Sequence, residues 1–124
     1  MTQPARSLKV LYGEQDEELA RSQAALLANA GYAVETAIGR RGLQDALGQG
    51  SFDLVILGGT LTRDDRHHLP YVVKKISTAT RVLVMHTDGA RHPYVDANTD
   101  TGAGMEEMLR KISALPARTA AAGA

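Results

Sequence analysis

The stretch GEQDEE at residues 13–18 places four carboxylates directly after a short apolar run. Such a cluster repels phosphate groups, and the chain contains neither GxGxxG nor GxxxxGK[ST], so the sequence argues against a nucleotide or flavin site. Carboxylate oxygens suit a hard cation such as Mg²⁺, and Glu14 and Asp16 are the candidate ligands. Glu17 and Glu18 need no ligand, because acidic residues stabilise the first turn of a helix. We therefore expect no cofactor, and the pair Glu14 and Asp16 remains the alternative metal site.

The histidines and serines do not complete a second kind of site. No two histidines stand at i, i+4, the chain has no cysteine, and adjacent His67 and His68 would point about 100° apart on a helix. A hydrolase is equally unsupported, because no G-x-S-x-G elbow exists and Ser51 precedes its strand. We interpret the histidines as surface residues: His67, His68, His86 and His92.

A buried-looking strand within FDLVILGG, residues 52–59, ends in two glycines where a reactive side chain would be expected. Glycine offers no nucleophile in any protonation state. Asp53 cannot substitute for one, because it opens the strand and lies roughly 16 Å from its end at about 3.3 Å per residue. The sequence thus predicts a platform at Gly58 without a reactive group.

Composition narrows the class of protein. The 124 residues are 44% hydrophobic, with 14 basic and 14 acidic residues, no cysteine and no long apolar run. These values predict one domain over residues 7–115 between flexible tails at 1–6 and 116–124, and they argue against nucleic-acid binding, disulfides and a membrane span. The first residues lack the apolar middle of a signal peptide, so we expect a cytoplasmic protein.

Hydrophobic periodicity predicts alternating strands and helices. The fold class is therefore α/β, a parallel sheet with helices on both faces and a site at the carboxyl ends of the strands. The expected strands are 7–13, 32–37, 52–58, 81–86 and a weak one at 94–101; the expected helices are 16–31, 39–50, 66–78 and 104–115.

Two consecutive stretches, LKVLYGEQDEELARSQAALLANAGYAV and ETAIGRRGLQDALGQGSFDLVILGG, resemble the receiver domain of two-component response regulators. The later segments RVLVMH and VDANTDTGAGMEEMLRKI match that family more loosely. The resemblance implies a flavodoxin-like, doubly wound, five-stranded sheet in the order 2-1-3-4-5.

The family's chemistry, by this resemblance, needs an acidic pair that holds Mg²⁺, an aspartate that accepts a phosphoryl group, a hydroxyl residue that senses it and a lysine that pairs with it. In this chain those functions fall on altered residues, since one carboxylate is kept, one is lost and the acceptor is a glycine. The degenerate positions are Glu14 and Gln15, Gly58, His86 with Thr87 beside it, and Thr101.

These departures predict a stand-alone pseudo-receiver, a signalling or protein-interaction module with no catalytic residue, since no effector domain fits after Leu115. Asp64 and Asp65, in the loop after the third strand, are the alternative acceptors. The alternatives in function are a small-ligand or metal-binding module and a small enzyme using Glu14, Asp16, His86, Thr87, Asp100 and Thr101.

The connection TDGARHP, between the last two strands, is too short for the helix that the family has there. That helix is expected to be shortened or missing, which would leave Leu83 or Met85 and Val95 bare. Exposed apolar surface often marks a partner site. The sequence therefore predicts a protein partner, either another signalling protein or a second copy, at the edge formed by the fourth and fifth strands.

Overall fold

The computed structural model describes residues 8–87 and 92–115, so the expected tails at 1–6 and 116–124 lie outside the described residues. Within these ranges strands and helices alternate as predicted. The strands are β1 (Lys9–Glu14), β2 (Ala33–Ile38), β3 (Leu54–Leu57), β4 (Arg81–Met85) and β5 (Ala97–Thr99); the helices are α1 (Glu17–Asn29), α2 (Gly39–Gln49), α3 (Arg63–Ile76) and α4 (Met105–Ser113). No helix in this part of the chain is long and apolar enough to cross a membrane.

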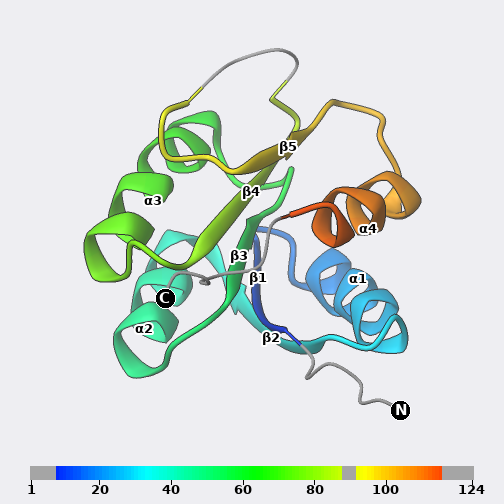
Figure 1. Cartoon of the computed structure of the whole chain (residues 1–124), viewed down its shortest axis with the longest axis horizontal. Helices are drawn as coiled ribbons and strands as arrows, with labels where there is room; N and C mark the ends of the chain where they lie inside the picture. The colour runs from blue at the N-terminus through cyan, green and yellow to red at the C-terminus, as the bar shows by residue number, and fades with distance from the viewer. Residues whose placement is uncertain (1–7, 88–91, 116–124) are drawn as a thin grey trace.

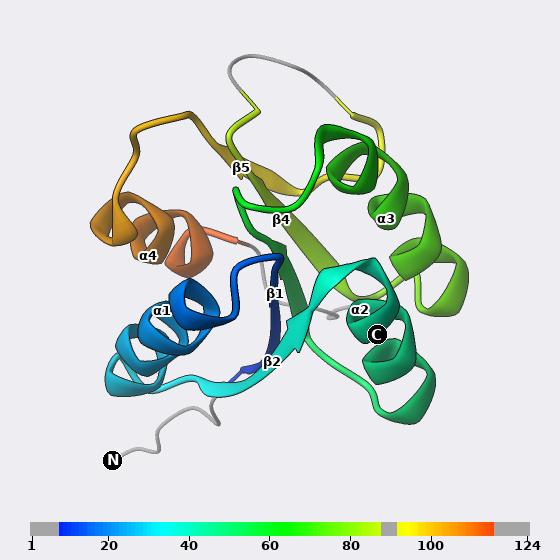
Figure 2. The ribbon, with the colours of Figure 1, turned by 180° about the vertical axis from the view of Figure 1, so that it is seen from behind.

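The strands form one parallel sheet in the order β2-β1-β3-β4-β5, which confirms the predicted topology. Helices α2 and α3 cover one face, and α1 and α4 cover the other (Figure 1; Figure 2 shows the same layers from behind). Successive side chains of a strand point to opposite faces. Val55 and Leu57 of β3 therefore enter the layer under α2 and α3, whereas Leu54 and Ile56 enter the layer under α1 and α4.

Helix α3 begins earlier than predicted. Thr62 caps it, because its hydroxyl oxygen accepts a hydrogen bond from the Asp65 backbone N–H at 3.0 Å. Asp64 and Asp65 thus lie in the first turn of α3 and not in a loop. Acidic side chains in the first turn interact favourably with the positive end of the helix dipole. With this earlier start, Pro70 lies inside the helix.

The connection between β4 and β5 contains no helix at its described residues, 86–87 and 92–96, in agreement with the expected loss. The prediction that apolar side chains would be exposed there, however, was wrong. Leu83 and Met85 are buried beneath Met108 and Ile112 of α4, and Val95 packs partly buried against the layer on the other face. The terminal helix and the connection itself cover the sheet there, so burial of apolar surface is preserved.

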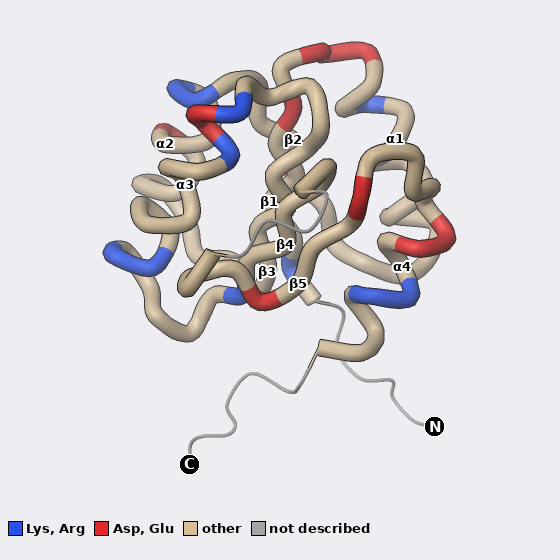
Figure 3. Tube along the Cα trace, turned by 90° about the horizontal axis from the view of Figure 1, so that it is seen from above, with Lys and Arg blue, Asp and Glu red and all other residues tan. Residues whose placement is uncertain are grey.

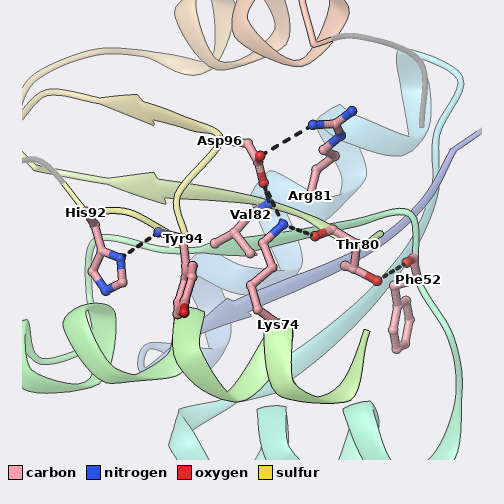
Figure 4. A network of polar contacts seen from close by, with 8 residues as sticks. All are labelled: Phe52, Lys74, Thr80, Arg81, Val82, His92, Tyr94 and Asp96. Atoms are coloured by element: carbon pink, nitrogen blue, oxygen red, sulfur yellow. Dashed lines mark hydrogen bonds and ion pairs between the residues drawn. The ribbon is translucent and has the colours of Figure 1, made fainter. Parts of the chain in front are cut away.

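Asp96 joins the start of β5 to β4 and α3 (Figure 4). Its carboxylate accepts hydrogen bonds from Lys74 Nζ at 3.0 Å, from the Val82 backbone N–H at 2.8 Å and from Arg81 Nη1 at 3.4 Å. Lys74 also donates to the Thr80 carbonyl oxygen at 2.6 Å. A three-residue edge strand is weak by itself, so this network supports β5 where the helix is missing.

We expect Asp96→Ala to lower the free energy of unfolding by roughly 2 kcal/mol, because it leaves partly buried cationic and amide donors without their acceptor. Urea denaturation followed by circular dichroism measures the loss. Asp45→Ala, an exposed aspartate of α2, is the control and should change stability by less than about 0.5 kcal/mol. Equal transition midpoints for the two variants would contradict a structural role for Asp96.

Candidate functional site

The carboxyl ends of the parallel strands meet at one edge of the sheet and bring the predicted site residues there. Glu14 ends β1, Gly58 follows β3, His86 follows β4 and Thr101 lies just beyond β5. The register aligns these ends, since Gly13 is opposite Leu57 and the Gly58 N–H donates to the Gly13 carbonyl oxygen at 2.8 Å. The predicted edge is therefore present.

Glu14 points into the protein and is fully buried. Its carboxylate accepts hydrogen bonds from the Thr60 backbone N–H at 2.9 Å, from the Thr60 hydroxyl at 2.6 Å and from the Tyr12 phenol. A buried carboxylate is costly unless such donors satisfy it. The bonds from Tyr12 and Thr60 satisfy the buried carboxylate of Glu14.

Tyr12 links this carboxylate to α1. Its phenolic oxygen also lies 2.5 Å from Gln23 Oε1, and because a phenol has one proton it donates to one of the two oxygens at a time. Burial raises the pKa of Tyr12 far above its ordinary value, and the hydrogen bond and charge of Glu14 raise it further. Tyr12 therefore acts here as a neutral hydroxyl donor.

Thr60 holds the loops of this edge together, and it was not singled out from the sequence. Besides donating to Glu14, its hydroxyl oxygen accepts hydrogen bonds from the backbone N–H groups of Gln15 at 2.8 Å and Asp16 at 3.1 Å. One hydroxyl thus ties the loop after β1 to the loop after β3. The signal in the sequence was a threonine two residues after Gly58, opposite the acidic loop.

Gly58 and Gly59 make room for side chains from the two neighbouring strands. A Cβ atom on Gly58 would lie 2.0 Å from Glu14 Cδ and 2.2 Å from both carboxylate oxygens. A Cβ atom on Gly59 would lie 2.2 Å from Cε1 of the His86 ring. Glycine at position 58 is therefore required by Glu14, whose carboxyl group fills the space beside the strand end.

The end of β4 is bent by His86, whose φ of 63° lies in the left-handed region. Arg66 Nη1 donates to the Met85 carbonyl oxygen at 3.1 Å, and the Thr87 N–H donates to the Thr99 carbonyl oxygen at 3.0 Å. Arg66 Nε and the hydroxyls of Thr87 and Thr99 are buried without a hydrogen-bond partner in the described part of the protein. The hydroxyl that the resemblance implied is thus present beside His86, on Thr87, but it is buried.

The remaining predicted residues do not converge. Asp16 caps α1, with its Oδ1 accepting from the Leu19 N–H at 3.1 Å, whereas Gln15, Asp100 and Thr101 are exposed. No group of three or more metal-binding side chains occurs among residues 8–87 and 92–115. The carboxylates at this edge are not placed to coordinate Mg²⁺ together. Glu14 is turned inward and bonded to Tyr12 and Thr60, whereas Asp16 is bonded to the start of its own helix.

No protein-family model matches the chain, and no curated protein matches its sequence. Several solved structures are similar in fold. A CheY-like response regulator receiver domain protein from Methanospirillum hungatei JF-1 is 17% identical with a TM-score of 0.73, over 86% of this chain and 91% of that one. The response regulator TrrA of Thermotoga maritima, in complex with Mg²⁺ and BeF, is 15% identical with a TM-score of 0.74. The match covers 86% of this chain and 96% of that one.

A third similar structure is a response regulator of Burkholderia pseudomallei with a phosphorylated aspartic acid, a calcium ion and citrate. It is 20% identical, with a TM-score of 0.70 over 85% of this chain and 66% of that one. At these identities the comparisons establish the fold and leave the activity open. The chain has the CheY-like receiver fold, with the sheet order 2-1-3-4-5.

Proposed function

We propose that this chain is a cytoplasmic pseudo-receiver: a signal-transduction module that binds proteins, is not an enzyme, and is not phosphorylated by the usual aspartyl route. One observation carries the proposal. The strand end that would present an acceptor carries Gly58, and the Glu14 carboxyl group occupies the space that a side chain there would need.

Glu14 does not replace the missing acceptor. A carboxylate that attacks a phosphoryl group must reach it, and Glu14 is fully buried with its oxygens engaged by Tyr12 and Thr60. Asp65 lies 3.7 Å from Arg40 in an ion pair, and Asp64 is exposed in the first turn of α3, beyond the strand end. The arrangement thus supports loss of the phosphorylation chemistry with retention of the scaffold.

Without a transferable phosphate, any switching must come from a partner that binds one conformation more tightly than another. The side of the molecule formed by β4, β5 and their connection is the proposed place of contact. The described residues of its connection form no helix, unlike an ordinary receiver, and the connection carries the exposed aromatic side chain of Tyr94. The partner is a signalling protein or a second copy of the chain.

The phosphorylation test is incubation with acetyl phosphate and Mg²⁺, followed by intact-mass measurement. We expect no added phosphoryl mass, because the strand end lacks a nucleophile. The Burkholderia pseudomallei response regulator, whose structure contains a phosphorylated aspartic acid, is the positive control. An added mass on this chain that disappears in Asp64→Asn or Asp65→Asn would show that phosphorylation has moved to α3 and would overturn the proposal.

A further inference from the structure

Four rings form one continuous aromatic cluster between α3 and the connection to β5: His67, Tyr71, His92 and Tyr94. The ring centroids of Tyr71 and Tyr94 are 5.0 Å apart, edge to face, and those of Tyr71 and His92 are 4.7 Å apart. His67 contacts His92 at 5.0 Å. Figure 4 shows His92 and Tyr94 beside α3.

The two tyrosines of this cluster lie at the surface, in a chain that is poor in aromatic residues. The sequence contains one phenylalanine and four tyrosines. Tyr71 and Tyr94 remain 40% and 43% exposed, whereas Tyr12 is fully buried. Large apolar surface that is left exposed as a contiguous group is typical of an interaction site, and tyrosine is enriched in the contacts that dominate binding energy.

Hydrogen bonds orient the His92 ring at the centre of the cluster. Nε2 of His92 lies 2.8 Å from the His67 carbonyl oxygen, and the Tyr94 backbone N–H donates to His92 Nδ1 at 3.1 Å. Because Nδ1 accepts that bond, Nε2 carries the proton and donates to the carbonyl. Both ring nitrogens are engaged, so the ring orientation is fixed and a partner would lose less conformational freedom on binding.

The surface around the cluster is rich in donors and cations. Arg63, His67, Tyr71 and Lys75 follow one another at intervals of four residues, so each is a neighbour of the next along a stripe that winds around α3, and all four are exposed. Figure 3 shows basic and acidic residues together at the start of α3 and basic residues at its end. Asp64 is exposed near Arg63.

Two other carboxylates near this face are already in ion pairs. Asp65 pairs with Arg40, and Asp96 pairs with Lys74 and Arg81. Among residues 8–87 and 92–115, the face therefore offers a guanidinium, an ammonium and two phenols to a partner, against one exposed carboxylate, Asp64.

We infer that this face docks an acidic segment of another protein, with an apolar side chain of the segment on Tyr71 and Tyr94 and its carboxylates on Arg63 and Lys75. The inference rests on the proposed function, since it names the partner chemistry of a module that works by binding. A nucleic acid fits less well, because two strong cations beside Asp64 do not form a track for successive phosphates and the chain has no net charge.

The test titrates the full chain with a short synthetic peptide that carries glutamates on both sides of a Leu-Phe pair. Backbone NMR shifts locate binding, and fluorescence anisotropy measures affinity at low and high salt. We expect shifts confined to α3 and residues 92–96, and affinity that falls with salt. Tyr71→Ala with Tyr94→Ala, and separately Arg63→Glu with Lys75→Glu, should each weaken binding at least about tenfold.

Matched controls lie on α1, on the opposite face of the sheet. Leu26→Ala replaces an exposed apolar residue that is 48% accessible, and Arg21→Glu reverses an exposed charge. Both should bind the peptide as the wild type does. The charge-reversal variant leaves the rings in place, so it tests the surface even if the double tyrosine variant unfolds.

Four outcomes would overturn the inference. They are no binding, equal binding of a peptide with glutamine in place of glutamate, tighter binding of an oligothymidylate, and a dimer by light scattering that the tyrosine variants abolish. A phosphorylated wild-type chain would instead overturn the proposed function and leave this docking result standing. Absence of peptide binding would leave the phosphorylation result standing.

Discussion

Replacing Gly58 with alanine is expected to destabilise the protein by about 3 kcal/mol. The new Cβ would lie 2.0–2.2 Å from three atoms of the buried Glu14 carboxyl group. That group must then move away from Tyr12 and Thr60, which combines the cost of overpacking with lost buried hydrogen bonds. Gly58→Asp should cost more, because it also places a second carboxyl group beside the first. Urea denaturation measures both changes.

Two other glycines of the chain are matched controls for this substitution. Gly59→Ala directs its Cβ at the His86 ring, which is half-buried and can swing toward solvent, so the expected cost is about 1 kcal/mol. Gly48→Ala, near the end of α2 with no heavy atom within 4 Å of the new Cβ, should stabilise the protein by up to about 1 kcal/mol. Equal effects at Gly58 and Gly59 would contradict the special role of Glu14.

Removing the Glu14 side chain is expected to cost about 3 kcal/mol as well. Glu14→Ala leaves the Thr60 N–H and hydroxyl without their acceptor and opens a cavity in a buried position. Glu14→Gln should cost only about 1 kcal/mol, because the amide oxygen can still accept from Thr60 while the Tyr12 phenol donates to Gln23. Thermal and urea unfolding of the two variants measure the difference.

Glu18→Ala, an exposed glutamate in the first turn of α1, should change stability by less than about 0.5 kcal/mol. The double variant Glu14→Ala with Gly58→Ala should lose at least about 1 kcal/mol less than the sum of the single losses, because the clash is absent once the carboxyl group is gone. Additive losses would show that the two positions do not depend on each other.

These two predictions have one structural meaning. A receiver that had lost only its acceptor would regain it by a single Gly58→Asp change, with room for the new side chain. Here Glu14 has taken that room and is held by Tyr12 and Thr60. We therefore expect restoration of an acceptor to require changes on two strands, β1 and β3.

Local patterns predicted most of the fold. Apolar runs bounded by glycines indicated the strands, and Glu17 and Glu18 were correctly placed in the first turn of α1. The short connection after β4 correctly indicated a missing helix at its described residues. These features depend on residues close together in the chain, where periodicity and capping act directly.

Long-range packing was predicted less well. Leu83 and Met85 were expected to be exposed to solvent, because the local sequence pattern does not indicate that α4 packs over them. The inward direction of Glu14 was also missed. Its three hydrogen bonds come from Tyr12 on the same strand and from Thr60, which is 46 residues away in the sequence.

The sequence by itself determined the alternation of elements, the place of the strand ends and the absence of a nucleophile at Gly58, because each follows from residue type and local spacing. The tertiary structure decided that Glu14 is a buried acceptor for Thr60 and that Tyr71 and Tyr94 share an exposed cluster. Contacts of this kind join residues far apart in the chain, and their geometry exists only after the layers pack together.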